Sequence, residues 1–334
     1  MNTFGENIRL TIFGESHGEA IGMVLDGFPA GEQIELDRLR EELKRRAPGG
    51  AETVSPRKEC DEPEFLSGIF NDHTTGAPLC AIIRNTDVDS SSYHPELPRP
   101  GHADLAAQIK FKGRADFRGG GAFSGRLTAP MVLAGALCKQ ALERRRVSVQ
   151  ARILSVGGVD RSAEDFDYAV HKEILEARSV GDSVGGVVEC VASGVPAGIG
   201  GLMFGGMESR IAQALYAIPG VKGVEFGAGF EIAKMRGTQA NDPIVTENGV
   251  VFTETNHAGG INGGITNGMP LVLRCAFRPT PSISREQKTV DLMKKENTTI
   301  RTLGRHDPCI VPRALPVVEA MVAFCLLDAM CEPR

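Results

Sequence analysis

Gly14-Glu-Ser-His-Gly-Glu-Ala-Ile-Gly-Met-Val-Leu-Asp-Gly-Phe-Pro-Ala-Gly31 is the stretch that sets the architecture, because both of its ends occur again later in the chain. The opening pentapeptide returns as Gly181-Asp-Ser-Val-Gly185 and the closing one as Gly194-Val-Pro-Ala-Gly198. Both are displaced by the same number of residues, since 181 − 14 = 194 − 27 = 167. A repeat with one constant offset predicts a single domain over residues 1–334, with an internal pseudo-repeat at about 8–50 and 175–220.

Each copy predicts the same succession of elements. An apolar run, 21–25 in the first copy and 187–191 in the second, predicts a strand that leads through the Pro-Ala-Gly turn to a helix. A Pro-Gly pair ends each helix. The apolar helix positions are Leu36, Leu39, Leu43 and Ala47 in the first copy and Ile211, Leu215 and Ile218 in the second. His17 corresponds to Val184, so only the first copy is expected to carry chemistry.

Strand and helix patterns also alternate outside the repeat. Strands are predicted at 8–13, 79–84, 147–156, 221–226, 250–254 and 271–277. Helices are predicted from Thr128 and Pro130 to about Arg146, from a cap at 162–165 to about Arg178, and from Pro316 onward. The first and last of these helices are apolar on nearly every face, which places them between layers or in a subunit interface. The predicted fold class is α/β (α+β), a βαβ sandwich built from two related halves.

Composition excludes several classes of function. The chain of 334 residues is 42% hydrophobic and can bury a large core. A net charge of −5 and an aromatic content of 5% argue against a nucleic-acid surface. The eight cysteines form no Cys-x-x-Cys pair and are expected to be reduced and buried. No signal-peptide layout is present and the apolar run 317–330 is too short for a membrane span, so the expected location is the cytoplasm.

Three clusters concentrate groups that bind anions or transfer protons. His17 ends an apolar strand between small residues, which should leave its imidazole accessible. Arg99-Pro-Gly-His-Ala-Asp104 precedes a glycine-rich run, and Gly304-Arg-His-Asp307 precedes an apolar helix. Taken singly, each cluster also has an ordinary structural explanation. The two histidines fit as local hydrogen-bond donors, and Asp307 fits as a helix cap or an ion-pair partner of Arg305.

Together and in this order, the clusters resemble those of chorismate synthase, and the resemblance runs from Phe13 to Met330. Further motifs that carry it are Lys44-Arg-Arg-Ala-Pro-Gly49, Phe117-Arg-Gly-Gly-Gly121, Asp182-Ser-Val-Gly-Gly-Val-Val-Glu189, Gly194-Val-Pro-Ala-Gly198, Asn256-His-Ala-Gly-Gly260 and Phe277-Arg-Pro-Thr-Pro-Ser-Ile283. The resemblance implies a βαβ sandwich assembled as a homotetramer.

It also implies a lyase. The reaction would be a 1,4-elimination of phosphate from 5-enolpyruvylshikimate 3-phosphate to give chorismate, in the shikimate pathway of aromatic amino acid biosynthesis. Reduced FMN would be the cofactor, with NADPH or a separate reductase as its source of electrons. Two alternatives stay open at this point: a phosphohydrolase using His306 and Asp307, which the absence of metal-ligand spacing disfavours, and a non-catalytic FMN-binding protein.

The resemblance assigns roles to particular residues. His17 would protonate the reduced flavin, His102 would act as an acid toward the leaving phosphate, and Asp307 would accept the proton from N5 of the flavin. Planar guanidinium groups suit phosphate and carboxylate, and the substrate-binding ones would be Arg46, Arg99 and Arg305. The family's basic residue after Pro-Gly is Glu52 here, so Arg57 or Lys58 would supply that charge or the site would have one cation fewer.

The flavin-binding loop departs from the family pattern. Relatives carry Arg-Ser/Ala-Ser-Ala-Arg-Glu-Thr, whereas this chain has Ala122-Phe-Ser-Gly-Arg-Leu-Thr128, in which Ala122 and Leu127 replace the charged residues. The run lacks the spacing of a P-loop or of a Rossmann glycine motif. The resemblance places FMN contacts at Ser124, Arg126, Gly263, Arg278, Pro279, Thr280, Pro281, Ser282 and Arg305. No metal site is expected.

Overall fold

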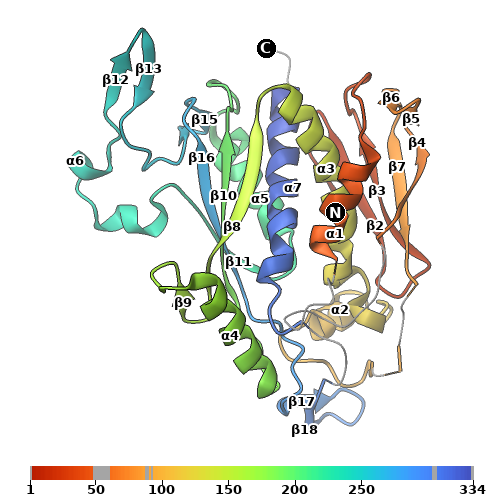
Figure 1. Cartoon of the computed structure of the whole chain (residues 1–334). Helices are drawn as coiled ribbons and strands as arrows, with labels where there is room; N and C mark the ends of the chain where they lie inside the picture. Colours follow the sequence, from red (N-terminus) through yellow and green to blue (C-terminus); the bar gives the residue numbers. More distant parts are fainter. Residues whose placement is uncertain (1, 48–60, 87–89, 92, 303–306, 332–334) are drawn as a thin grey trace.

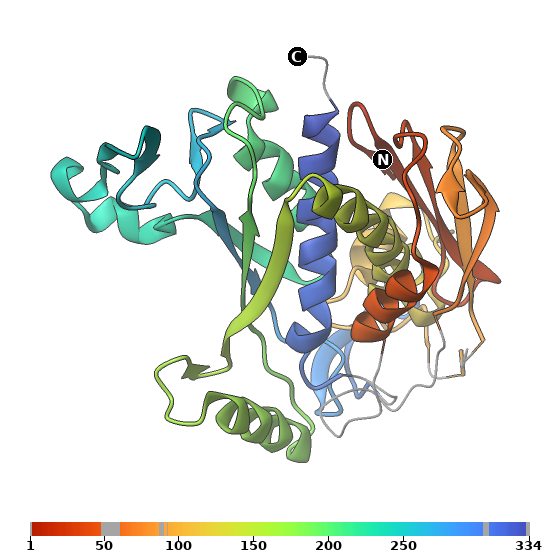
Figure 2. The same cartoon turned by 45° about the horizontal axis from the view of Figure 1, so that its top comes forward.

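The computed structural model describes residues 2–47, 61–86, 90–91, 93–302 and 307–331. Glu52, Arg57, Lys58, Arg305 and His306 therefore lie outside the described residues. Two five-stranded sheets enclose a layer of helices, as Figures 1 and 2 show from two directions. The predicted βαβ sandwich is thus confirmed.

All strand pairs in the two sheets are antiparallel. The first sheet has the order β1 (Thr3–Phe4), β2 (Arg9–Gly14), β3 (Ala20–Asp26), β7 (Leu79–Arg84) and β4 (Pro63–Ser67). The second has the order β11 (Val221–Phe226), β16 (Leu271–Phe277), β10 (Gly186–Ser193), β8 (Ser148–Val156) and β9 (Val159–Asp160). Burial alternates residue by residue along β16, because one face of the sheet covers the helices.

Four helices fill the space between the sheets: α1 (Leu36–Arg46), α3 (Thr128–Arg144), α5 (Met207–Tyr216) and α7 (Val311–Met330). Nearly every residue of α7 is buried, and α3 is buried along most of its length. Both helices were predicted to be apolar all round, and burial between layers confirms the prediction. Helix α7 begins earlier than predicted, at Val311, with Pro312 in its first turn and Pro316 inside the helix. Proline suits the first turn because its missing N–H would have no partner there.

Shorter elements connect and extend these layers. The remaining helices are α2 (Asp104–Lys110), α4 (Phe166–Ser179) and α6 (Gly237–Ala240), with 3-10 turns η1 (Arg118–Phe123), η2 (Gly125–Leu127), η3 (Met203–Gly205) and η4 (Gly229–Lys234). The hairpins are β5–β6 (Ile69–Phe70, His73–Thr74), β12–β13 (Ile244–Glu247, Val250–Thr253), β14–β15 (Ile261–Asn262, Ile265–Thr266) and β17–β18 (Gln287–Asp291, Glu296–Ile300). Within the described residues, no helix combines the length and apolar composition needed to cross a membrane.

The two halves share one order of elements along the chain. The succession β2, β3, α1, β4, β7, α3 is followed by β8, β10, α5, β11, β16, α7, and corresponding strands hold corresponding places in their sheets. The two Pro-Ala-Gly turns also accept the same kind of hydrogen bond, from a threonine hydroxyl to the carbonyl oxygen of the proline. The Thr74 hydroxyl donates to Pro29 O at 2.6 Å, and the Thr266 hydroxyl donates to Pro196 O at 2.6 Å. The duplication itself stays a prediction, and these shared features are the observations on which we propose it.

Candidate active site

A cavity of about 590 Å³ lies at one end of the helix layer. Its walls come from the C-terminal end of α1, the segment before α2, the turns η1 and η2, the segment after β16 and the first turns of α7. Ten of the predicted site residues line it: Arg46, Arg99, His102, Ser124, Arg126, Arg278, Thr280, Pro281, Ser282 and Asp307. Segments far apart in the sequence therefore meet here.

Positive charge predominates among the described residues that line the cavity. The basic ones are Arg46, Arg99, Arg126, Lys222, Arg278 and Arg313, and the acidic ones are Asp104 and Asp307. A concave site with an excess of one charge attracts ligands of the opposite charge. The cavity is therefore suited to a ligand with several anionic groups. Nowhere in the described chain do three or more metal-ligating side chains gather.

Two of these arginines share one buried carboxylate. Asp61 Oδ2 accepts from Arg46 Nε at 3.1 Å and from Arg46 Nη2 at 2.5 Å, while Asp61 Oδ1 accepts from Arg126 Nη1. Burial alone would raise the pKa of Asp61, but the charges of Arg46 and Arg126 outweigh it and hold the pKa below its usual value. Burial lowers the pKa of Arg46 to about 10, with Asp61 opposing the shift, so Arg46 is charged at neutral pH.

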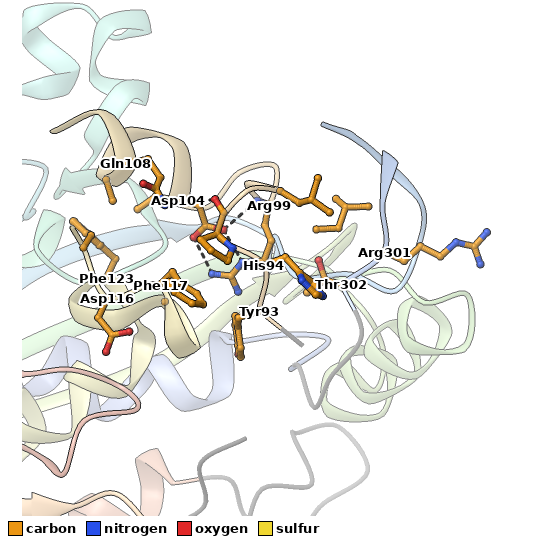
Figure 3. A pocket seen from close by; sticks show the side chains of 17 residues that line it. Tyr93, His94, Arg99, Asp104, Gln108, Asp116, Phe117, Phe123, Arg301 and Thr302 are labelled. Carbon is orange, nitrogen blue, oxygen red and sulfur yellow. Dashed lines mark hydrogen bonds and ion pairs between the residues drawn. The ribbon is translucent and has the colours of Figure 1, made fainter. Parts of the chain in front are cut away.

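Arg99 is held rigidly at the cavity wall. Its Nε donates to Asp104 Oδ2 at 2.7 Å and its Nη2 donates to Oδ1 at 2.9 Å, a bidentate pair drawn in Figure 3. The guanidinium also stacks 5.0 Å from the centre of the Tyr93 ring. Burial opposes ionisation of Asp104, but hydrogen bonds and charge from Arg99 lower its pKa overall. On the other side of this pair lies a smaller cavity of about 130 Å³, with Thr302 in its wall.

His102 lies in the cavity and is tied to the segment that follows β16. Its Nε2 is 2.6 Å from the Ser282 hydroxyl. Arg278 from the same segment donates from Nη1 to Gly101 O at 2.8 Å. Gly101 has a φ of +75°, a backbone conformation that favours glycine. These contacts bring the second cluster of the sequence together with the predicted flavin segment.

His17 was predicted to be accessible, and the structure corrects this. Its side chain is buried, with 6% of the residue exposed, because it lies beneath the glycine-rich loop and against Tyr93. His17 Nδ1 is 2.8 Å from the Ser90 hydroxyl. A Cβ on Gly119 would lie 2.5 Å from His17 Nε2, so the loop contacts the ring through bare backbone. Gly119 and Tyr93 both line the cavity, so His17 lies one layer behind its wall.

Asp307 forms an ion pair with Arg313 of α7, whose Nη1 donates to Asp307 Oδ2, and the expected partner Arg305 lies outside the described residues. The helix-cap alternative is not what the structure shows, since α7 begins four residues later with Ile310 at its N-cap position. Arg313 Nε also donates to Arg46 O at 2.8 Å. The start of α7 is thereby joined to the end of α1 at the cavity.

Ser124 caps the turn η2, since its hydroxyl accepts from Arg126 N at 3.3 Å. It thus supports the position of Arg126. Two predicted flavin contacts do not line the cavity. Pro279 lies next to lining residues, whereas Gly263 lies in the β14–β15 turn, where its neighbour Gly264 packs against the chain at Gly201 and Gly206. Gly263 is therefore not part of this cavity, because that hairpin packs against the start of α5 instead.

Sequence reasoning missed Asp61, Lys222 and Arg313, all of which belong to the site or support it. Arg313 stands in the proline-rich stretch that contains Asp307, so its proximity to that cluster was a usable signal. Lys222 is a single charged residue, and Asp61 is one of several charged residues at 57–64, so nothing local singles out either of them.

Comparisons with known proteins agree on one family. A family model described as chorismate synthase matches residues 8–331. The chain is similar to the chorismate synthase of Thermococcus kodakarensis, with 48% identity over 99% of this chain and 98% of the relative. The chorismate synthase of Thermococcus gammatolerans is 49% identical over the same shares. A crystal structure of a chorismate synthase aligns with a TM-score of 0.76 and 30% identity, covering 98% of this chain and 92% of the other.

Proposed function

Because this chain belongs to the chorismate synthase family, we propose that the positively charged cavity is the site of its reaction. The chain is a lyase that forms chorismate and phosphate from 5-enolpyruvylshikimate 3-phosphate, in the shikimate pathway. The family requires reduced flavin. The observation that carries the assignment of the site is the meeting of Arg46, Arg99, His102 and Asp307, four residues from three distant segments, in one cavity.

The residues present fit both anionic ligands. The substrate has a phosphate and two carboxylates, and the cavity has an excess of cations to pair with them. We assign Arg46 and Arg99 to the substrate, together with Arg305, which lies outside the described residues. We assign Ser124, Arg126, Arg278, Thr280 and Ser282 to the flavin, which we propose to be FMN. The Thr280 hydroxyl is buried and has no hydrogen-bond partner among the described residues, so a ligand could supply one.

When bound, reduced flavin supplies the electron density that eases departure of phosphate, since no carbonyl acidifies the C–H bond to be broken. The protein's part is positioning and proton transfer. Arg99 is fixed bidentately by Asp104 and can stabilise negative charge as it grows on the leaving phosphate. His102, near Arg99 in the cavity, can donate a proton to that phosphate.

His17 and Asp307 are assigned the proton transfers on the flavin side. Asp307 is a carboxylate in the cavity wall and can accept a proton, and Arg313 orients it. His17 lies behind Gly119 and can reach the ligand only past that glycine. A side chain at Gly119 would close the approach, which supports a role for bare backbone at this point.

The defining experiment is an anaerobic assay of chorismate formation with the enolpyruvyl substrate and FMN, with and without dithionite. We expect product only when the flavin is reduced. Equal activity with oxidised FMN, or without flavin, would overturn the proposed use of the cofactor. Adding NADPH in place of dithionite tests whether the protein reduces its own flavin.

We further propose a homotetramer in the cytoplasm. Large apolar side chains are exposed on η3, on η4 and on the β12–β13 hairpin, which projects from the body of the protomer (Figure 2). They include Leu202, Met203, Phe204, Phe230, Ile244, Val250 and Val251. Large apolar side chains are costly to leave in water, so subunit contacts are the natural use for them. The seven described cysteines are all free, in keeping with a reducing compartment.

A further inference from the structure

We propose that Asp61 is a positioning residue that holds Arg46 and Arg126 as a single anion-binding unit in the cavity. The inference rests on the proposed function of the cavity and deepens it. Asp61 lies in none of the three clusters and carries no role in the assignments above. Its side chain is 1% exposed, so it does not face the ligand itself.

The geometry shows how one carboxylate orients both guanidinium groups. Each of its oxygens serves a different arginine, Oδ2 serving Arg46 and Oδ1 serving Arg126. The two arginines come from different elements, α1 and η2, that are 80 residues apart. Asp61 is thus the common point that fixes the distance and angle between them.

Other contacts hold the outer edges of the two groups. Arg46 Nη1 donates to the Thr128 hydroxyl at 3.4 Å, and Arg126 Nε donates to Asn85 Oδ1 at 3.1 Å. The contacts of Arg46 described here use three of the five N–H groups of its guanidinium. Arg46 also lines the cavity, so a ligand there would meet a guanidinium group whose direction Asp61 fixes.

The positive charges of Arg46 and Arg126 explain why a shared carboxylate is needed to hold the two side chains together. Two buried guanidinium groups that face one site repel each other, and burial disfavours both charges. With Asp61 between them, the unit has a net charge of +1 and a defined shape. Arg313 adds a third cation at the same wall through its bond to Arg46 O. Without Asp61, we expect these side chains to move apart and lose the common geometry.

Positioning and simple charge neutralisation predict opposite results for Asp61→Asn. This substitution keeps the shape of the side chain and removes its negative charge. If Asp61 only weakened the positive field, the variant would bind anions more tightly. If Asp61 positions the arginines, the variant binds anionic ligands more weakly, although the loss of the carboxylate charge makes the cavity more positive.

The test is isothermal titration calorimetry of the full chain with 5-enolpyruvylshikimate 3-phosphate and, separately, with FMN. We expect Asp61→Asn to weaken substrate affinity by roughly tenfold or more, the usual effect of losing a hydrogen bond to a charged group. FMN affinity should fall as well if Arg126 contacts its phosphate. Unchanged or tighter binding of both ligands would overturn the inference.

Asp61→Glu provides the second variant, in which the charge is kept but the carboxylate is one methylene farther from the backbone. Positioning predicts that it still binds substrate more weakly than the natural chain. Full affinity in this variant would mean that charge alone matters and would overturn the inference. This comparison also serves if Asp61→Asn fails to fold.

Asp328→Asn is the matched control. Asp328 is another buried carboxylate, and it accepts from the backbone N–H groups of Asn7 and Ile8 at 2.8 and 2.7 Å, away from the cavity. This control should lower thermal stability and leave both affinities unchanged. Calorimetry measures binding without turnover. Weaker binding by the Asp61 variants would therefore support the positioning role of Asp61 even if the natural chain formed no chorismate. Absence of binding by the natural chain would overturn both proposals.

Discussion

His17 and His102, the two proposed catalytic histidines, are each bonded to one serine hydroxyl, but through different ring nitrogens. His17 is bonded to Ser90 through Nδ1, and His102 is bonded to Ser282 through Nε2. The bond orients the ring, and either tautomer is compatible with it because a hydroxyl can donate or accept. The Ser90 contact points Nε2 of His17 at Gly119, the glycine that separates it from the cavity.

Replacing either histidine with alanine should lower turnover by roughly 10² to 10⁴, the usual contribution of a positioned general acid. Steady-state rates under anaerobic conditions measure this, with thermal melting as a check on folding. His73→Ala is a suitable control, since His73 is exposed and lies in the β5–β6 hairpin. Near-normal rates combined with lower melting temperatures would show that the two histidines are structural.

Asp307→Asn should bind flavin and substrate but turn over slowly. The amide retains an oxygen that can accept from Arg313, so the start of α7 should keep its place, but the amide cannot take up a proton. Calorimetry for binding and single-turnover rates for chemistry separate the two effects. Weakened binding with unchanged turnover would instead make Asp307 a positioning residue.

Helices α3 and α7 cross at a point where no side chain fits on α3. A Cβ on Gly135 would lie 2.1 Å from the Cβ of Ala320, closer than any real contact between such atoms. Two small residues facing each other let the helices approach closely, and both sheets pack on the layer that results. The start of α7, which carries Asp307 and Arg313 to the cavity, depends on this crossing.

Gly135→Ala should therefore destabilise the protein by about 1–3 kcal/mol, the usual cost of overpacking a core. Gly237→Ala is the matched control, because a Cβ at Gly237 meets nothing within 4 Å. Urea unfolding measures both variants. A change below about 0.5 kcal/mol for Gly135→Ala, the size expected at a surface position, would contradict the packing described here.

Glu319 is a buried charge that joins several elements. It accepts from Arg45 of α1, from Lys139 of α3 and from the backbone N–H of Ala151 in β8. Burial opposes its ionisation, but the hydrogen bonds and charges of Arg45 and Lys139 lower its pKa overall. A lowered folded-state pKa contributes stability that is complete above the ordinary carboxyl value of about 4.3 and is lost as the pH falls below it.

Glu319→Gln should lower stability at pH 7 and reduce the loss of stability between about pH 4.3 and pH 3, because the titrating group is absent. Urea unfolding at several pH values measures both the stability at pH 7 and the loss of stability at acidic pH. Glu231→Gln is the comparison, since the ion pair that the structure describes for this glutamate, with Lys234, is exposed. If the curve of Glu319→Gln ran parallel to that of the natural chain below pH 4.3, Glu319 would not be the group responsible.

Several exposed apolar side chains outside the sandwich bear on the proposed assembly into a tetramer. Phe204 on η3 is 96% exposed and Phe230 on η4 is 81% exposed, values that are costly for aromatic side chains in water. The β12–β13 hairpin and α6, which follow η4 in the chain, lie on the side of the second sheet away from the first (Figure 1). The cavity opens elsewhere, at the end of the helix layer.

We expect the natural chain to be a tetramer by light scattering after size-exclusion chromatography, and Phe204→Glu to dissociate at least in part into smaller species. A charge placed in an apolar interface must be desolvated without a partner. Tyr168→Glu, on the exposed side of α4, should leave the mass unchanged. A monomeric natural chain, or an unaltered mass for Phe204→Glu, would contradict the proposed assembly.

The local sequence pattern was sufficient to predict most of the helices and strands. The predicted strands at 221–226 and 271–277 coincide with β11 and β16, and the repeat predicted equivalent strands and helices in both halves. Periodicity, turn residues and helix ends act over a few residues, so they can be recognised in one dimension. The resemblance of whole motifs then identified Arg46, Arg99, His102, Ser282 and Asp307, which the structure brings to one cavity.

Tertiary structure alone decided which side chains meet. The role of Asp61 became visible only when α1 and η2 were packed together, because nothing distinguishes it from its charged neighbours at 57–64 as the partner of two distant arginines. The burial of His17 and the place of Gly263 outside the cavity were likewise set by which loops and hairpins pack against each other. The physical reason is that secondary structure arises from neighbours in the chain, whereas a site arises from neighbours in space.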